Sequence, residues 1–167
     1  MMASDNERAQ KVFETLESLN IAYVLHKHPP VYTVEEAKMH AEGIEGLHCK
    51  NLFLRDQKGK KHFLVVAEND KPIQVKEVGR KLGAGNLSFA SPERLLKHLD
   101  LEPGSVSPFG LINDMDHKVI LVLDEDLKQS DKINFHPNDN SKTITISYAD
   151  FEKFVKSTGN SVKIISL

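Results

Sequence analysis

Polar groups beside an apolar strand mark the first place in this chain where chemistry could occur. Lys50 and Asn51 precede the apolar run 52–54. The ammonium group of Lys50 suits contact with a phosphate or a carbonyl oxygen, and Asn51 could orient the partner. Lysine at the edge of an apolar strand is also a common surface residue that keeps its charged end in water. The two residues alone leave both interpretations open.

Two further candidates lie in loops. Residues 103–110 read Pro-Gly-Ser-Val-Ser-Pro-Phe-Gly, and prolines near both ends predict a shaped loop without regular secondary structure. Such a loop is either a plain connection or a rigid wall whose backbone N–H groups face an anion or an oxyanion. His136 and the Pro-Asn pair that follows it occupy a turn between two predicted strands. Turn formation explains the proline and the asparagine but not the histidine.

The eight histidines raise the question of a metal site. His26 and His28 share one face of a predicted strand, a spacing that zinc ligands use. No cluster of His, Asp or Glu elsewhere in the sequence completes the set, so hydrogen-bonded histidines are expected and no metal or other cofactor is predicted. Cys49, the single cysteine, lies in an alternating strand pattern typical of a small apolar side chain. One cysteine allows no internal disulfide, which fits a reducing compartment.

Charge is distributed unevenly along the chain. The net charge of −2 argues against a polyanionic partner. Residues 46–81, however, hold nine Lys or Arg against four acids, so this segment carries +5 and the remainder −7. The N-terminus has no signal-like apolar segment, and no run approaches the ~20 apolar residues of a membrane span. A cytoplasmic protein without a membrane partner is therefore expected.

Hydrophobic periodicity and capping signals predict a single α+β domain over residues 1–167. Two capping boxes, which begin at Ser4 and Thr33, predict helices over 5–19 and from 34 to near Gly43. Three more helices are expected over 74–82, 92–99 and 148–157. About seven strands are expected, at 22–28, 48–54, 62–67, 118–123, 133–136, 143–147 and 162–165, with 87–89 as a short strand at best. Several connections are too short for a crossover helix, so the sheet should be mixed, mostly antiparallel and flanked by helices.

Four segments occur together in an order and spacing that resemble a known family. They are His28-Pro-Pro-Val-Tyr-Thr33, Lys50-Asn-Leu-Phe-Leu54, Gly104-Ser-Val-Ser-Pro-Phe-Gly110, and His136-Pro-Asn138 followed by Thr143-Ile-Thr-Ile146. Over nearly its whole length the chain resembles the YbaK/ProX family of aminoacyl-tRNA editing domains, which also occur inserted in bacterial prolyl-tRNA synthetases. Within that family it looks most like the free-standing alanyl-tRNA(Pro) deacylases.

The resemblance implies a trans-editing hydrolase that cleaves the ester between a wrong amino acid and the terminal adenosine of tRNA(Pro). The implied catalytic positions are Lys50, which would hold the substrate backbone or the terminal phosphate, its neighbour Asn51, and His136 in the pocket that measures the amino acid. The implied substrate-binding positions are Tyr32, Thr33, Gly104, Ser105, Val106, Ser107, Pro108, Phe109, Gly110 and Asn138. Many relatives have glycine before this histidine. Here Phe135 stands in its place, which puts the size preference of the pocket in question.

The implied chemistry needs few special groups. An aminoacyl ester is already activated, so its hydrolysis requires placement of a water, exclusion of larger side chains and stabilisation of an oxyanion. Mischarged tRNA(Pro) is the implied partner, prolyl-tRNA synthetase and an elongation factor are candidate protein partners, and the basic segment 46–81 should lie beside the pocket. Three alternatives stay open: a deacylase for cysteinyl-tRNA(Pro) or another aminoacyl-tRNA, a catalytically silent tRNA- or synthetase-binding module of the same fold, and a metal-dependent hydrolase that uses His26 and His28.

Overall fold

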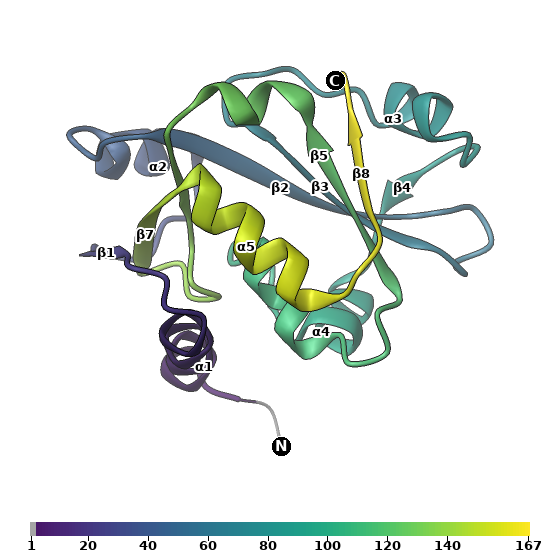
Figure 1. The fold of residues 1–167 in the computed structure, drawn as a ribbon. Coiled ribbons are helices and arrows are strands. Elements are labelled where there is room, and N and C mark those ends of the chain that lie inside the picture. The colour runs from purple at the N-terminus through teal and green to yellow at the C-terminus, as the bar shows by residue number, and fades with distance from the viewer. Residues whose placement is uncertain (1–2) are drawn as a thin grey trace.

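A mixed β-sheet organises the molecule, which we describe from a computed structural model that covers residues 3–167 (Figure 1). Within these residues eight strands run in the order β1-β7-β6-β2-β3-β5-β8, with β4 paired to β2. Four neighbouring pairs are antiparallel, and three (β2–β6, β3–β5 and β5–β8) are parallel. The prediction of a mixed, mostly antiparallel sheet is confirmed. The strands are β1 (Val24–Lys27), β2 (Leu47–Arg55), β3 (His62–Glu68), β4 (Ser88–Phe89), β5 (Val119–Asp124), β6 (Lys132–Phe135), β7 (Lys142–Ser147) and β8 (Val162–Ile165).

Helices flank the sheet, and all but α3 begin at the caps that the sequence predicts. They are α1 (Asp5–Ser18), α2 (Val34–Ala41), α3 (Val75–Leu82), α4 (Pro92–Leu99) and α5 (Tyr148–Thr158). The hydroxyl groups of Ser4, Thr33, Ser91 and Ser147 each accept a hydrogen bond from the backbone N–H three residues further on. These bonds satisfy donors that the first helical turn leaves free, so each helix starts at its cap. None of the helices in residues 3–167 is long and apolar enough to cross a membrane.

Apolar side chains form two cores, one on each face of the sheet. The larger core combines residues of α1, α4 and α5 with inward-facing strand residues, and it includes the fully buried Phe109, Phe151 and Phe154. The smaller core lies between the other face and α3, where Val78 packs with strand residues such as Leu54. Because both faces are covered, residues 62–67 of β3 are all buried.

The segment 103–110 is more ordered than expected. Its second half enters a 3-10 helix, η1 (Pro108–Asn113), whose first turn is capped by the Ser107 hydroxyl at 3.1 Å from the Phe109 backbone nitrogen. The prediction that this segment lacks regular structure is therefore wrong from Pro108 onward. Proline suits the first helical position because the N–H it lacks has no partner there. A second 3-10 helix, η2 (Glu125–Gln129), follows β5 and was also not predicted.

The sheet opens along one edge of β2. On that edge β6 pairs only with Leu47 and His48, and β4 pairs only with Leu54 and Arg55. Within the described chain, no strand pairs with residues 49–53 of β2 on that side. The other edge of β2 pairs with β3 from Cys49 to Arg55, so the strand is anchored on that side. The space between β2 and β6 is where a cavity forms.

Candidate functional site

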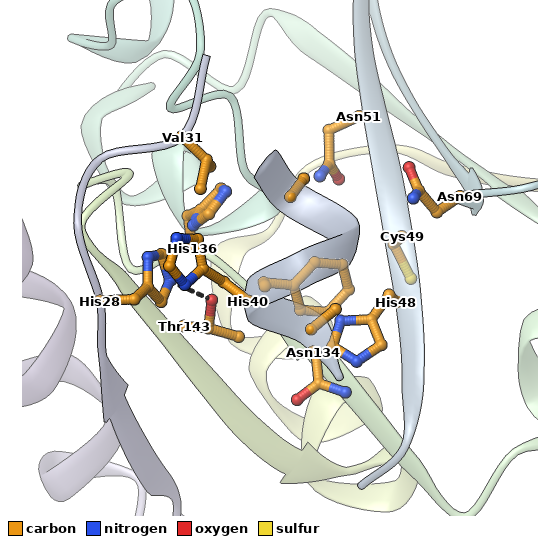
Figure 2. A pocket seen from close by; sticks show the side chains of 13 residues that line it. His28, Val31, His40, His48, Cys49, Asn51, Asn69, Asn134, His136 and Thr143 are labelled. Carbon is orange, nitrogen blue, oxygen red and sulfur yellow. Dashed lines mark hydrogen bonds between the residues drawn. The ribbon is translucent and has the colours of Figure 1, made fainter. Parts of the chain in front are cut away.

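A cavity of about 550 Å³, its open mouth included, occupies the gap between β2 and β6 (Figure 2). Polar side chains reach it from β2 (Cys49, Asn51), from β6 and the residues after it (Asn134, His136), and from β7 (Thr143). Cys49 and Asn51 face it together because alternate residues of a strand point to the same side. Its lining in the described chain includes no Asp, Glu, Lys or Arg. The cavity is therefore polar but carries no fixed charge.

The segment before α2 and α2 itself also line the cavity. Pro29 and Pro30 end β1, because proline cannot donate to the sheet ladder, and the chain then crosses to the cavity mouth. Asn140, in the turn after β6, donates from Nδ2 to the Val31 carbonyl at 3.1 Å and holds this crossing segment in place. Val31 and α2 residues such as Ala37 supply the apolar part of the wall.

His136 is a neutral hydrogen-bond acceptor in this wall. Its Nδ1 lies 2.7 Å from the Lys142 carbonyl oxygen, so Nδ1 carries the ring proton and donates it. Burial holds the pKa of His136 below its ordinary value, although the bond to Lys142 opposes this effect. The ring is consequently uncharged at neutral pH, and Nε2 keeps its lone pair. No partner of Nε2 is found among residues 3–167.

Two more histidines stand beside His136. The His28 ring stacks on His40 of α2, with centroids 5.3 Å apart, and lies 6.1 Å from the His136 ring. His28 donates from Nδ1 to the Pro29 carbonyl at 2.9 Å, and its Nε2 lies 2.9 Å from the Thr143 hydroxyl (Figure 2). His26 contacts the hydroxyl of Thr145 in the same way at 3.2 Å. His26 on β1 and His28 just after it are therefore both hydrogen-bonded, as expected. In residues 3–167 no group of three or more His, Cys, Asp or Glu is arranged to hold a metal ion, and the absence of a metal stays a prediction.

Asn51 and Lys50 adjoin on β2 but have different surroundings. The Asn51 side chain lines the cavity, and its Oδ1 is buried without a hydrogen-bond partner in the described residues, which leaves Nδ2 as the group that faces the cavity. A buried polar atom without a partner costs about 1–3 kcal/mol. Lys50 is half-buried and is not among the lining residues. Strand alternation turns its side chain to the face opposite Asn51.

The mouth of the cavity continues into a second depression. Gly104 and Pro103 form one side of it, Tyr32 and Thr33 another, and His136 is shared with the cavity. Gly104 has a φ of +91°, a left-handed conformation that side chains disfavour, so glycine suits this position. Tyr32 is 77% exposed. The structure thus brings five of the sequence-predicted positions together at the cavity and its mouth: Tyr32, Thr33, Asn51, Gly104 and His136.

The rest of the predicted binding loop lies in the core. Phe109 is fully buried, and its ring meets Phe135 and Phe154 edge-on. A Cβ on Gly110 would lie 2.7 Å from Leu101 Cδ1, so the missing side chain permits close packing. Ser105, Ser107 and Pro108 are buried as well, and Val106 packs against the larger core. Packing, rather than a cavity, surrounds the side chains of residues 105–110, and their contact with a ligand stays a prediction.

Asn138 and Phe135 border the site from the interior. Asn138 is fully buried in the turn after β6, with a φ of +62°, and neither polar atom of its side chain has a hydrogen-bond partner in residues 3–167. It is not among the cavity-lining residues. Phe135 is 3% exposed, packs against Phe151 with ring centroids 4.9 Å apart, and also lines the cavity. Phe135 therefore links the size of the cavity to the packing of the core.

Several cavity residues escaped the sequence analysis. They are His40, His48, Asn69 and Asn134. The Asn134 amide donates to the carbonyls of Glu45 and Leu47 and accepts from the Thr145 hydroxyl, so it ties the start of β2 to β6 and β7. A polar residue inside a buried strand was the available signal for Asn134. The other three gave none, because they lie in elements whose contacts with the cavity are long-range.

Cys49 and the basic segment also have defined places. Burial, with a smaller effect of the Glu68 charge, raises the pKa of the Cys49 thiol, so the thiol stays protonated and lacks the nucleophilic thiolate. The lysine-rich turn at 58–61 lies at the far end of β2, because the strand carries the chain about 13 Å from Asn51 to Arg55 before the turn begins. The expectation that these lysines lie beside the pocket is wrong.

Comparison with known proteins identifies the family to which the chain belongs. Residues 28–154 match the model of a family described as aminoacyl-tRNA editing domain. Over 164 residues the chain is 47% identical to the prolyl-tRNA editing protein ProX of Acetoanaerobium sticklandii, with 98% of this chain and 99% of that protein covered. The chain belongs to the aminoacyl-tRNA editing domain family.

Other relatives of this editing domain agree with that membership. It is 37% identical to prolyl-tRNA synthetase associated domain-containing protein 1 of Mus musculus, with 99% of both chains covered. A crystal structure of a candidate trans-editing enzyme for prolyl-tRNA synthetase shares its fold, with a TM-score of 0.68 at 19% identity over 96% of this chain and 97% of that one. Editing of an aminoacyl-tRNA is hydrolysis of its ester, so the prediction of an aminoacyl-tRNA deacylase is confirmed. That it works without a metal stays a prediction.

Proposed function

We propose that this editing domain deacylates mischarged tRNA(Pro) and prefers alanyl-tRNA(Pro). The main support is the cavity, which offers Asn51 and His136 beside apolar walls and is narrowed by Phe135. The likeness to a prolyl-tRNA editing protein supports tRNA(Pro) as the carrier of the amino acid. The proposal assigns the amino acid to the cavity and the terminal adenosine to the depression at its mouth.

In the proposed reaction a water adds to the carbonyl carbon of the ester. The C–O bond to the ribose then breaks, the ribose oxygen takes a proton, and the products are the free amino acid and a deacylated tRNA. The Asn51 Nδ2–H group is the cavity-facing donor and would stabilise the oxyanion that forms on the carbonyl oxygen. Gly104 would position the adenosine end through its backbone. The contact of Lys50 with the phosphate is implied by the family resemblance alone, because strand alternation places this side chain on the face of β2 opposite the cavity.

Rejection of the correct amino acid would be steric in this scheme. A hydrophobic pocket gains only about 1–3 kcal/mol per methylene, so selection by lost contact is weak. A clash is stronger, and the buried ring of Phe135 cannot move without disturbing Phe151 and Phe109. The ring of a prolyl ester would meet this wall, whereas the methyl group of an alanyl ester would not.

The decisive experiment is a deacylation panel over tRNA(Pro) charged with Ala, Ser, Cys or Pro, with purified protein and no added metal. We expect alanyl-tRNA(Pro) to be hydrolysed fastest and prolyl-tRNA(Pro) to be spared. A parallel series with a chelator tests the metal-dependent alternative. Absence of turnover on the alanyl, seryl and cysteinyl esters, with binding of tRNA retained, would instead support the silent binding module.

A further inference from the structure

A cavity that binds an aminoacyl ester must accommodate its α-amino group, which is a hydrogen-bond donor. Carboxylates usually receive such a group in proteins, but no Asp or Glu lines this cavity in the described residues. The acceptor must therefore be a neutral atom. Burying an amino group without an acceptor would cost about 1–3 kcal/mol, so the position of the acceptor bears directly on affinity and selectivity.

Most neutral acceptors in the cavity are already engaged. The Oδ1 atom of Asn134 accepts from the Thr145 hydroxyl, and Nε2 of His28 lies at 2.9 Å from the Thr143 hydroxyl. The Oδ1 atom of Asn51 is buried, so it is not available to a ligand. His48 is tied through Nε2 to the Ile44 carbonyl. Neither His48 nor His40 borders the depression at the mouth.

His136 differs from these in geometry. Its Nδ1–H bond to the Lys142 carbonyl at 2.7 Å fixes the tautomer and directs the lone pair to Nε2. The turn behind it is held by Asp139, which accepts from the Lys142 ammonium group and from the Ser141 hydroxyl. His136 also borders both the cavity and the depression at its mouth. In the proposed binding mode the ester carbonyl lies where the cavity meets the depression at its mouth. The α-carbon is bonded to the carbonyl carbon, so the α-amino group would lie beside His136.

We propose that Nε2 of His136 accepts a hydrogen bond from the α-amino group of the aminoacyl ester. This inference rests on the proposed function and adds that the site requires an α-amino group. Histidine suits the role because a neutral ring that donates its proton through Nδ1 can accept a hydrogen bond at Nε2 without carrying a charge. The site would thereby distinguish an aminoacyl ester of the terminal adenosine from an acyl ester of the same size that lacks the α-amino group.

The test compares two esters of equal size on one tRNA(Pro), alanyl and isobutyryl, in which a methyl group replaces the amino group. Each rate is divided by the spontaneous hydrolysis rate of the same ester. We expect the protein to accelerate alanyl hydrolysis at least about tenfold more than isobutyryl hydrolysis, the effect of one hydrogen bond to a charged or polar group. The His136→Ala variant should lose this preference through a slower alanyl reaction, with the isobutyryl reaction changed less than about twofold.

Two comparison variants sharpen the result. His26→Ala removes an imidazole that contacts a β7 threonine but does not line the cavity, and it should keep the preference. Asn69 also borders both the cavity and its mouth and carries a neutral acceptor, so loss of the preference in Asn69→Ala but not in His136→Ala would overturn the proposal. Equal slowing of both esters by His136→Ala would also overturn it, because that pattern indicates a structural role.

A binding measurement separates this inference from the proposed function. Adenosine that carries alanine or isobutyrate through a stable 3′-amide cannot be hydrolysed, and its affinity is measured directly. We expect the alanyl amide to bind about tenfold more tightly than the isobutyryl amide, and His136→Ala to abolish the difference. Failure of the deacylation panel with this difference intact would refute the proposed hydrolysis alone. Equal binding of both amides would refute the role of His136 alone.

Discussion

Phe135 offers the sharpest test of how the core determines selectivity. Its ring is 3% exposed, packs against Phe109 and Phe151, and forms part of the cavity wall. The Phe135→Ala substitution removes the ring and joins the vacated space to the cavity. We expect the variant to be less stable and to hydrolyse prolyl-tRNA(Pro), because the space left by a benzyl ring admits the ring of proline.

The stability loss follows from burial. Substitution of a fully buried phenylalanine by alanine costs about 3–5 kcal/mol, from lost transfer free energy and from the cavity that remains. Total stability of a domain of this size is about 5–15 kcal/mol, so the variant should still fold at room temperature. Urea unfolding should show a midpoint lowered in proportion, with an unchanged slope.

Phe151→Ala is the matched control. Phe151 is equally buried and contacts Phe135, but it does not line the cavity. We expect a similar fall in the free energy of unfolding and no gain of prolyl-tRNA(Pro) hydrolysis. If both variants gain prolyl hydrolysis, loosening of the core is sufficient and the steric argument fails. If neither does, Phe135 does not exclude proline.

Three further predictions concern other parts of the molecule. Lys50→Ala should lower kcat/KM for alanyl-tRNA(Pro) by about 10- to 100-fold, the effect of one lost charge-assisted hydrogen bond. The urea midpoint should change little because the side chain is half-exposed. An unchanged kcat/KM would remove Lys50 from the site. Gly110→Ala should destabilise the fold by about 1–3 kcal/mol in urea unfolding, because its Cβ would lie 2.7 Å from Leu101 Cδ1. Burial, helped by the nearby His98, lowers the pKa of His62 to about 4 from the ordinary 6.5. The unfolded chain therefore binds a proton before the folded one does, and stability should decline as pH falls from 6.5 to 4; His62→Gln should flatten that decline in urea titrations at several pH values.

Local signals in the sequence were sufficient for the elements. A hydroxyl that caps a helix acts within three residues, and the caps at Ser4, Thr33, Ser91 and Ser147 all start helices in the structure. Alternating and continuous apolar runs likewise placed the strands within a few residues of their bounds. The 3-10 helix at Pro108 escaped because its glycine- and proline-rich surroundings are typical of a loop.

The sequence also identified polar positions whose neighbours it could not assign. His136 was singled out because turn formation does not require histidine, and Asn51 because it begins an apolar strand. The segment that contains Gly104 was singled out for its prolines, but its composition did not reveal that the Phe109 side chain is buried in the core. The resemblance to the editing family joined these positions into one site, and the structure brings five of them to the cavity and its mouth.

Only the tertiary structure decided where the cavity lies and what lines it. The cavity exists because β6 pairs with just two residues of β2, and this register depends on contacts between segments about 85 residues apart. The same long-range pairing brings Asn134 to the start of β2, where it donates to the carbonyls of Glu45 and Leu47. Capping and periodicity act over a few residues and can be recognised in the sequence. Strand register and core packing are properties of the whole fold, so they determine which of the recognised residues meet.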